Sequence, residues 1–266
     1  MQKTISKSIS ISGLGIHTGV STKITLKPAK VNTGIRFARI DLKGSPEIKA
    51  NISNVFSTAR STSLREENAE IHTVEHILAA ITGSNIDNII IETNNIEIPI
   101  LDGSAKIYSK LIDQAGIATQ NAKKDYFEIS KKISFLDEET GSSIVAVPSD
   151  EYKVNITIDY DSKILGKQTG TLNNISNFKS EIASSRTFCF LHELEELVNN
   201  NLVKGGDINN AIVIVENKIS KKKLHKLQNI FNKPDIQVDK SGYLNNLTLR
   251  YQNEPARHKL LDVIGD

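Results

Sequence analysis

The chain has 266 residues, of which 38% are hydrophobic, so it is long enough to bury a sizeable core in one or two domains. Its formal net charge of +2 argues against nucleic acid as the main partner. The single cysteine, Cys189, excludes an internal disulfide framework and fits a reducing compartment. No apolar signal core follows Met1, and no run approaches the roughly 18 apolar residues of a membrane span. We therefore expect a cytoplasmic protein without stable membrane insertion.

The first part of the chain predicts short strands followed by a helix. Polar and apolar residues alternate over residues 5–11, 21–26 and 34–40, which indicates three strands. From Thr73 the apolar residues take helical spacing, and Gly83 ends the predicted helix. This part closes with an apolar strand over 88–92, a turn over 102–104 and a second helix over 105–114.

The rest of the chain partly repeats this order. A polar linker over 119–124 precedes strands predicted at 126–135, 143–147 and 153–160, and helical stretches follow. We interpret Lys221-Lys222-Lys223 as a solvated loop. The weak repeat predicts an α+β fold of two similar domains, 1–122 and 123–266, each a small, mostly antiparallel sheet layered with helices. The cleft between these domains is the expected active site.

Two stretches carry side chains suited to metal chemistry, His72-Thr73-Val74-Glu75-His76 and residues 258–266. On a helix, His258 and Asp262 lie four residues apart and share a face. Two imidazole nitrogens and one carboxylate oxygen, with a fourth position left for water, are typical of a catalytic zinc site. Glu75 lies beside His76 and has the chemistry of a general base for that water.

Each of these features is also common away from metal sites. A histidine in a helix is often a core or surface residue, and a His/Asp pair four residues apart is often a hydrogen bond on the helix surface. The stretch from His72 to His76 also matches the H-x-x-E-H pattern of inverted zinc peptidases, in which both histidines bind zinc and Glu75 is the base. The local spacing does not exclude a peptidase.

Several longer motifs follow one another along nearly the whole chain. They are Ser12-Gly13-Leu14-Gly15-Ile16-His17-Thr18-Gly19, Thr73-Val74-Glu75-His76-Ile77-Leu78-Ala79-Ala80, Ile86-Asp87-Asn88, Glu97-Ile98-Pro99-Ile100-Leu101-Asp102-Gly103-Ser104-Ala105, Ser185-Arg186-Thr187-Phe188, Gly205-Gly206, Asn210-Ala211-Ile212-Val213, and Arg257-His258-Lys259 through Gly265-Asp266. In this order and spacing they resemble the UDP-3-O-acyl-N-acetylglucosamine deacetylase family of lipid A biosynthesis. The resemblance implies a zinc-dependent hydrolase that removes acetate from a UDP-linked, acylated glucosamine.

The resemblance also implies how the metal is held. His76, His258 and Asp262 fall on the family's zinc ligands, and Glu75 falls on its general base. His72 falls on a position that does not bind the metal, which argues against the peptidase. We therefore expect Zn²⁺ as the cofactor.

Further residues match positions of the family that contact the substrate. Thr187 matches a hydroxyl that helps hold the oxyanion, Lys259 a cation near the substrate's diphosphate, and Asp266 a carboxylate that orients a catalytic histidine. Residues 188–215 match a βαβ insert that encloses the acyl chain. Its apolar side chains would supply the walls of that passage, and the residues that match the acyl-binding region are Phe188, Leu191, Leu194, Val203, Gly206, Ala211 and Val213. We expect a monomer.

The sequence differs from the family in three respects. The family continues past the segment that matches Gly265-Asp266 with residues that include a general-acid histidine, whereas no histidine follows His258 here. Residues 220–246 form a longer segment than is usual, and Cys189 stands in place of a glycine. We therefore expect slow turnover by these 266 residues. A truncated, weakly active or inactive homologue that still binds zinc and the nucleotide-sugar lipid stays an alternative.

Overall fold

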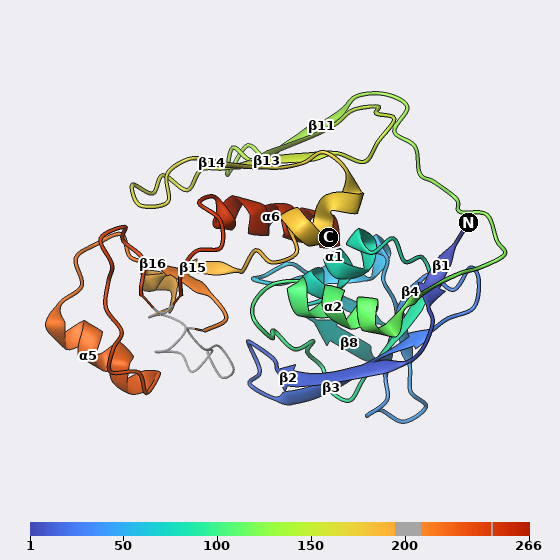
Figure 1. Ribbon diagram of the computed structural model, residues 1–266, viewed down its shortest axis with the longest axis horizontal. Coiled ribbons are helices and arrows are strands. Elements are labelled where there is room, and N and C mark those ends of the chain that lie inside the picture. Colours follow the sequence, from blue (N-terminus) through green and yellow to red (C-terminus); the bar gives the residue numbers. More distant parts are fainter. Residues whose placement is uncertain (195–208, 246) are drawn as a thin grey trace.

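The computed structural model describes residues 1–194, 209–245 and 247–266, which form small sheets and helices (Figure 1). This mixed α+β structure confirms the fold class predicted from the sequence. Among the described residues, no helix is both long and apolar enough to cross a membrane.

The largest sheet has five strands in the order β2-β3-β9-β4-β5. Strands β4 and β9 are parallel, and the other neighbours are antiparallel. Alternate residues of β3 are buried, so one face of the sheet packs against the core. The strands predicted at 21–26, 34–40 and 88–92 all lie in this sheet, whose members are β2 (Ile9–Leu14), β3 (Ser21–Pro28), β4 (Ile35–Arg39), β5 (Glu47–Lys49) and β9 (Ile89–Thr93).

The strand predicted over residues 5–11 is wrong in its bounds. The chain bends after β1 (Lys3–Ile5), which pairs with β10 (Ile117–Thr119) at the start of the predicted linker, and β2 begins only at Ile9. The sequence also does not predict the antiparallel sheet β6-β7-β8. Strands of three or four residues are too short for alternation to stand out. The strands of this sheet are β6 (Val55–Ser57), β7 (Ser63–Glu66) and β8 (Ala69–His72).

In the second half of the chain, the described residues form three pairs of strands. Two are antiparallel, and β15 (Phe188–Phe190) pairs in parallel with β16 (Ile212–Ile214). Parallel neighbours need a crossover connection, which fits the expected βαβ insert, although residues 195–208 within it lie outside the described residues. The antiparallel pairs join β11 (Ile133–Leu136) to β12 (Ser143–Ala146) and β13 (Val154–Ile158) to β14 (Gln168–Leu172).

Two expectations for this half need correction. The strand predicted over 126–135 begins only at Ile133, where the ladder with β12 begins. The stretch after residue 160 is not helical at first, because β14 returns along β13 before the short helix α3 (Phe178–Glu181). Apolar spacing alone did not distinguish a short antiparallel strand from a helical turn there.

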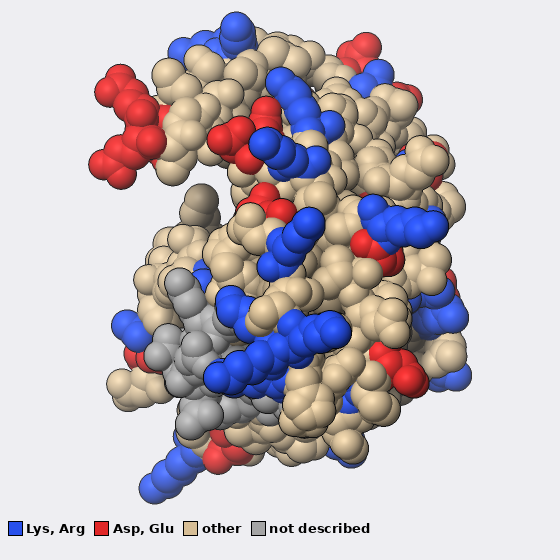
Figure 2. Space-filling model, turned by 90° about the vertical axis from the view of Figure 1, so that its left-hand side faces the viewer, with Lys and Arg blue, Asp and Glu red and all other residues tan. Residues whose placement is uncertain are grey.

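Helix α5 (Lys221–Ile230) replaces the loop expected at Lys221-Lys222-Lys223. The side chain of Ser220 caps the helix by accepting a hydrogen bond from the Lys223 backbone N–H. Leu224 and Leu227 pack into an apolar cluster, whereas the three lysines stay exposed. Figure 2 shows the end of the molecule that carries α5, with Lys and Arg side chains spread over its centre.

The chain folds into layers with helices at the centre (Figure 1). Helices α1 (Glu75–Gly83) and α2 (Lys106–Ala115) lie between the five-stranded sheet and α6 (Glu254–Gly265), and β13 and β14 contact α6 from the other side. One hydrophobic core contains side chains from both predicted domains, including Ile77, Leu172 and Leu260. The two halves therefore meet where α1 packs against α6. The domain bounds 1–122 and 123–266 stay a prediction.

Gly265 allows the end of α6 to lie directly against the start of α1. A Cβ atom at this position would lie 2.1 Å from the backbone carbonyl oxygen of Glu75 and 2.8 Å from its carbonyl carbon. These are backbone atoms, which cannot move aside as a flexible side chain can. Gly265 therefore sets how closely the last turn of α6 approaches the first turn of α1.

We expect Gly265→Ala to lower the free energy of unfolding by about 1–3 kcal/mol, because the added methyl group forces the two helices apart. Urea-induced unfolding measures this change. Val263→Ala is the control, since Val263 is 48% exposed on the same helix, and its effect should stay within about 0.5 kcal/mol. Equal stability of the Gly265→Ala and unmodified chains would show that the contact does not constrain the helices.

Candidate metal centre

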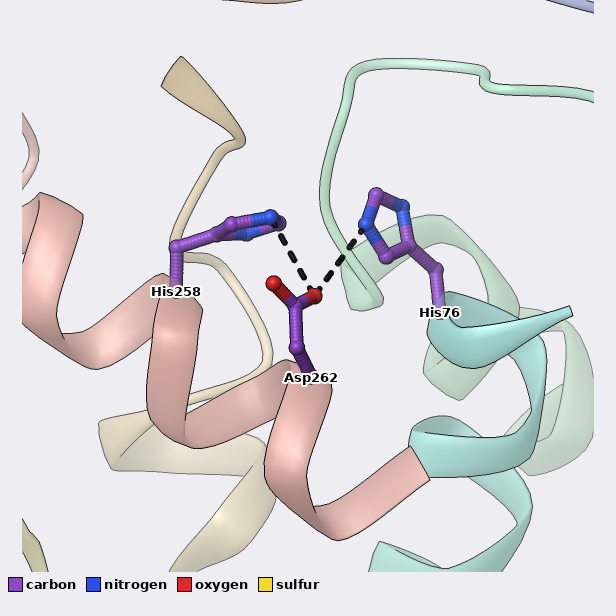
Figure 3. A group of neighbouring side chains, drawn as sticks. All are labelled: His76, His258 and Asp262. Atoms are coloured by element: carbon purple, nitrogen blue, oxygen red, sulfur yellow. Dashed lines mark ion pairs between the residues drawn. The ribbon is translucent and has the colours of Figure 1, made fainter. Parts of the chain in front are cut away.

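Three side chains from two helices converge at the contact between α1 and α6 (Figure 3). His76 is the second residue of α1, and His258 and Asp262 lie one turn apart on α6. One ligand atom from each of these residues lies within 4.8 Å of the other two. Within residues 1–194, 209–245 and 247–266, no other group of three or more His, Cys, Asp or Glu side chains converges in this way. The structure thus brings together the three residues expected to bind the metal.

The hydrogen bond of His258 determines which of its ring nitrogens faces the group. Its Nδ1 lies 3.0 Å from the carbonyl oxygen of Ser185, which can only accept, so Nδ1 carries the proton. The unprotonated Nε2 of His258 lies 3.3 Å from Asp262 Oδ1, and His76 Nε2 lies 3.6 Å from the same oxygen. Burial lowers the pKa of both rings, that of His76 to about 3. Two neutral imidazoles therefore face one carboxylate oxygen.

The donor atoms of this group fit a cation. Asp262 Oδ1 is buried and accepts no hydrogen bond from the described residues, and the Nδ1 of His76 is buried without a partner as well. A buried carboxylate oxygen is costly unless a donor or a cation compensates it. The second oxygen of Asp262, Oδ2, accepts a hydrogen bond from Lys259 Nζ at 2.9 Å. Two imidazole nitrogens and one carboxylate oxygen are the ligands of many catalytic zinc sites.

Glu75 and Asp266 lie beside this group, where the start of α1 meets the end of α6. Glu75 is only 8% exposed, and its Oε2 accepts a hydrogen bond from the Thr62 backbone N–H at 3.1 Å. Burial, together with the negative charges of Asp262 and Asp266, raises the pKa of Glu75 to about 8. Burial also raises the pKa of Asp266, whose Oδ1 accepts a hydrogen bond from the Thr62 hydroxyl at 2.6 Å. Both predicted catalytic carboxylates are thus near the candidate metal ligands, and Thr62 connects them.

His72 does not belong to this group. It is the last residue of β8, and Thr73 has a left-handed backbone conformation with φ of 59° before α1 begins at Glu75. The His72 ring forms a hydrogen bond with the Ser63 hydroxyl, with Nδ1 and Oγ 2.8 Å apart. Because His72 and His76 do not share a helix, the geometry does not favour the peptidase arrangement.

The other predicted polar residues lie on the segments around the group. Thr187 is half-buried, and its backbone N–H donates to the carbonyl oxygen of Gly103 while its carbonyl accepts from the Ile212 N–H, each at 2.8 Å. Lys259 Nζ, which bonds to Asp262, lies 5.8 Å from the ring centroid of Phe188. The expected contacts of Thr187, Lys259 and Phe188 with a substrate stay predictions.

Among the residues expected to line the acyl passage, Leu191, Leu194 and Val213 pack into one hydrophobic cluster. Ala211 is half-buried directly before β16. Val203 and Gly206 lie outside the described residues. The cluster also contains Val215, Leu227 of α5, Ile236 and Leu244, so the longer segment 220–246 packs against the insert.

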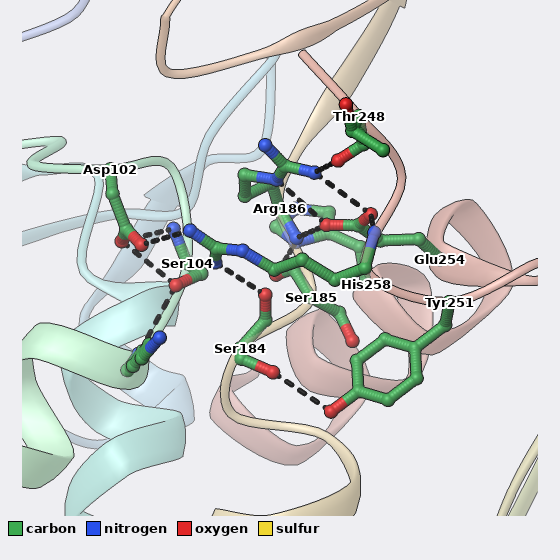
Figure 4. A network of polar contacts seen from close by, with 11 residues as sticks. Asp102, Ser104, Ser184, Ser185, Arg186, Thr248, Tyr251, Glu254 and His258 are labelled. Atoms are coloured by element: carbon green, nitrogen blue, oxygen red, sulfur yellow. Dashed lines mark hydrogen bonds and ion pairs between the residues drawn. The ribbon is translucent and has the colours of Figure 1, made fainter.

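A buried ion pair anchors α6 next to the candidate metal ligands, and the sequence analysis assigned it no role (Figure 4). Glu254 at the start of α6 binds Arg186, with Glu254 Oε1 and Arg186 Nε 2.8 Å apart. The side chains of Arg186 and Glu254 are 5% and 0% exposed. Arg186 also donates to the carbonyl oxygen of Thr248 at 2.6 Å. The sequence shows only that the Ser185-Arg186-Thr187 motif contains a charged residue. Nothing in the local sequence indicates that Arg186 is buried and forms an ion pair.

Four polar residues of α6 and its C-cap follow one another at four-residue intervals. Glu254 binds Arg186, His258 and Asp262 belong to the converging group, and Asp266 at the C-cap binds Thr62. Residues four apart lie on neighbouring positions of a helix surface. One strip of α6 therefore carries the anchor, two candidate ligands and a candidate catalytic carboxylate.

The chain is similar to known proteins along its whole length. The family model of the UDP-3-O-acyl N-acetylglycosamine deacetylases matches residues 2–234 and 232–266. The chain is 46% identical over its whole length to the bifunctional enzyme LpxC/FabZ of Bacteroides thetaiotaomicron, and it spans 58% of that protein. It is also 39% and 38% identical over its whole length to the UDP-3-O-acyl-N-acetylglucosamine deacetylases of Saccharophagus degradans and Chlamydia caviae, of which it spans 80% and 86%. With a match along nearly every residue and relatives this similar, the chain belongs to the UDP-3-O-acyl N-acetylglycosamine deacetylase family.

Proposed function

We propose that this chain is a zinc-dependent hydrolase that removes acetate from UDP-3-O-acyl-N-acetylglucosamine in lipid A biosynthesis. Its family and the names of its relatives support the reaction and the UDP-sugar substrate. The structural observation that carries the proposal is the convergence of His76, His258 and Asp262 beside Glu75. The cytoplasmic location and the monomeric state stay predictions.

His76, His258 and Asp262 are the residues that would hold the zinc ion. The hydrogen bond from His258 to the Ser185 carbonyl fixes the ring and directs Nε2 toward Asp262, as a second contact commonly does for a metal-binding histidine. When bound, zinc supplies a Lewis acid that polarises a carbonyl group and makes an attacking water more acidic.

Glu75 is the proposed general base. Its Oε2 is fixed by the Thr62 N–H, and the carboxylate is next in sequence to the ligand His76. A base is most effective when its pKa is near the working pH, and burial brings the pKa of Glu75 to about 8. We therefore assign to Glu75 the removal of a proton from the water that attacks the acetamide carbonyl.

Thr187 and Lys259 are the proposed contacts for negative charge on the substrate. Backbone hydrogen bonds on both sides of Thr187 hold this residue in place, and its hydroxyl would donate to the oxyanion that forms on the carbonyl. Lys259 lies beside Asp262, and its ammonium group would also attract the diphosphate of the substrate.

The alternative is a weakly active or inactive homologue that binds zinc and the nucleotide-sugar lipid. Incubation of the 266-residue chain with zinc and UDP-3-O-acyl-N-acetylglucosamine separates the two possibilities. Mass spectrometry of the nucleotide sugar would reveal loss of one acetyl group if the proposed reaction occurs. Binding without this mass change would support the alternative.

We expect His76→Ala and His258→Ala to lose zinc, because each removes one of three ligands. Elemental analysis of the purified chain after dialysis measures the stoichiometry. His72→Ala is the matched control, since His72 lies four residues before His76 but contacts Ser63, and it should keep about one zinc per chain. Zinc loss from His72→Ala together with retention by His258→Ala would favour the peptidase arrangement instead.

We expect Glu75→Gln to keep its zinc while kcat falls by about 100-fold or more, the usual contribution of general acid–base catalysis. Glutamine preserves the size of the side chain but cannot take up the proton. Glu138→Gln changes an exposed carboxylate in the β11–β12 turn and serves as the control. If Glu75→Gln loses zinc in parallel with activity, Glu75 is a ligand or a structural residue.

We expect Ala211→Phe to reject a substrate with a long acyl chain and to accept a short-chain analogue. The larger side chain fills the proposed passage at a point that only the longer chain reaches. The ratio of kcat/KM for the two substrates, compared with that of the unmodified chain, measures this selectivity. A parallel loss for both substrates would place the effect on folding rather than on the passage.

A further inference from the structure

Thr62 uses all three of its polar groups at the contact between α1 and α6. Its carbonyl oxygen accepts a hydrogen bond from the Val74 N–H at 3.3 Å, where the chain enters α1. Its backbone N–H donates to Glu75 Oε2 at 3.1 Å. Its hydroxyl donates to Asp266 Oδ1 at 2.6 Å. One residue directly before β7 therefore contacts the start of α1, the proposed base and the C-cap of α6.

These contacts connect parts of the chain that nothing in the local sequence brings together. Thr62 and Asp266 are 204 positions apart, whereas Thr62 and Glu75 are 13 apart. The last turn of α6 and the first turn of α1 are already in contact through Gly265 and the Glu75 carbonyl. Thr62 adds a second connection between these two turns through its hydrogen bonds to Glu75 and Asp266. Both side chains are therefore fixed relative to β7.

The two carboxylates need such a link because they are close to a third, Asp262, and like charges repel. Asp262 and Asp266 lie one turn apart at the end of α6, which touches the Glu75 backbone through Gly265. Thr62 places one donor on each of two carboxylates, and a hydrogen bond to an ionised carboxylate is stronger than one between neutral groups. The backbone N–H of Thr62 binds Glu75 and its hydroxyl binds Asp266, so each carboxylate has its own donor on one residue.

We propose that Thr62 is a positioning residue for the deacetylation, acting through its hydroxyl on Asp266 and through its backbone on Glu75. The inference rests on the proposed function and adds a residue that the family resemblance did not indicate. Thr62 is half-buried and takes no part in the hydrophobic core, so its hydroxyl can be removed without loss of core packing. Loss of the hydroxyl should therefore lower turnover strongly and lower the free energy of unfolding only by the contribution of the hydrogen bond to Asp266.

Thr62→Val tests the role of the hydroxyl, because valine keeps the shape and the backbone hydrogen bonds. We expect kcat to fall by about 10-fold, with KM within about twofold and the zinc content unchanged. Thr62→Ser restores the hydroxyl and should return kcat to within about threefold of the unmodified chain. A matched control is Thr140→Val, which removes another threonine–aspartate hydrogen bond, the 2.7 Å contact from Thr140 to Asp137 Oδ2 in the exposed β11–β12 turn. This variant should keep the unmodified kcat.

A double-mutant cycle with Asp266→Asn tests whether Thr62 acts through Asp266. We expect Thr62→Val to have little further effect on kcat once Asp266 is changed, because the contact is already lost. Urea unfolding of the same four chains provides a second readout, and we expect the Thr62 and Asp266 changes to be non-additive in stability as well. Additive effects on both kcat and stability would overturn the link to Asp266.

The outcomes separate this inference from the proposed function. Unmodified kcat in Thr62→Val overturns the positioning role while the deacetylase proposal stands. A fall in kcat that Thr62→Ser does not reverse overturns the role of the hydroxyl. No acetate release by the unmodified chain overturns the proposed function and this inference together.

Discussion

The buried ion pair of Arg186 and Glu254 is the interaction on which the geometry of the site depends. Glu254 Oε1 accepts from the backbone N–H and Nε of Arg186, and Oε2 accepts from Arg186 Nη2 and the Arg250 backbone N–H. These bonds fix the Ser185–Thr187 segment against the first turn of α6, where the negative charge also suits the helix dipole. The Ser185 carbonyl thereby meets His258. Removing one partner would leave an uncompensated buried charge, which typically costs about 3–5 kcal/mol.

The sequence predicted the α+β fold class and one pair of the converging side chains, but not how that pair meets the third. His258 and Asp262 share a face of a helix, and a four-residue spacing is enough to predict that. No spacing rule brings His76 to them, so that step depended on the resemblance. The three-stranded sheet β6-β7-β8 is built from strands of three or four residues, which are too short for alternation to reveal. Alternation also does not encode the hydrogen bond from Thr62 to Glu75 or the one between Ser63 and His72. Helix α5 forms where the sequence analysis expected a loop. Capping by Ser220 and burial of Leu227 outweigh the repulsion among the lysines of α5.

Charge is distributed unevenly around the converging side chains. The two histidines are neutral and each faces Asp262 Oδ1, whereas Lys259 occupies Oδ2. Burial alone would raise the pKa of Asp262. The neighbouring His258 and Lys259 lower this pKa by more than burial raises it, so the carboxylate is ionised near neutral pH. Asp262 and Lys259 thus cancel each other in net charge.

The four-residue interval along α6 has a consequence for how this protein family can change. A helix turns by about 100° per residue, so each step of four advances the side chain by about 40° and about 6 Å. From Glu254 to Asp266 the strip therefore winds by about 120°, from the segment that carries Arg186 to the segment that carries Thr62. An inserted or deleted residue between Glu254 and Asp266 would rotate every later member by about 100°. Substitutions on the outer face of α6 leave these four contacts intact, but any change in its length between the first and last of them breaks at least one.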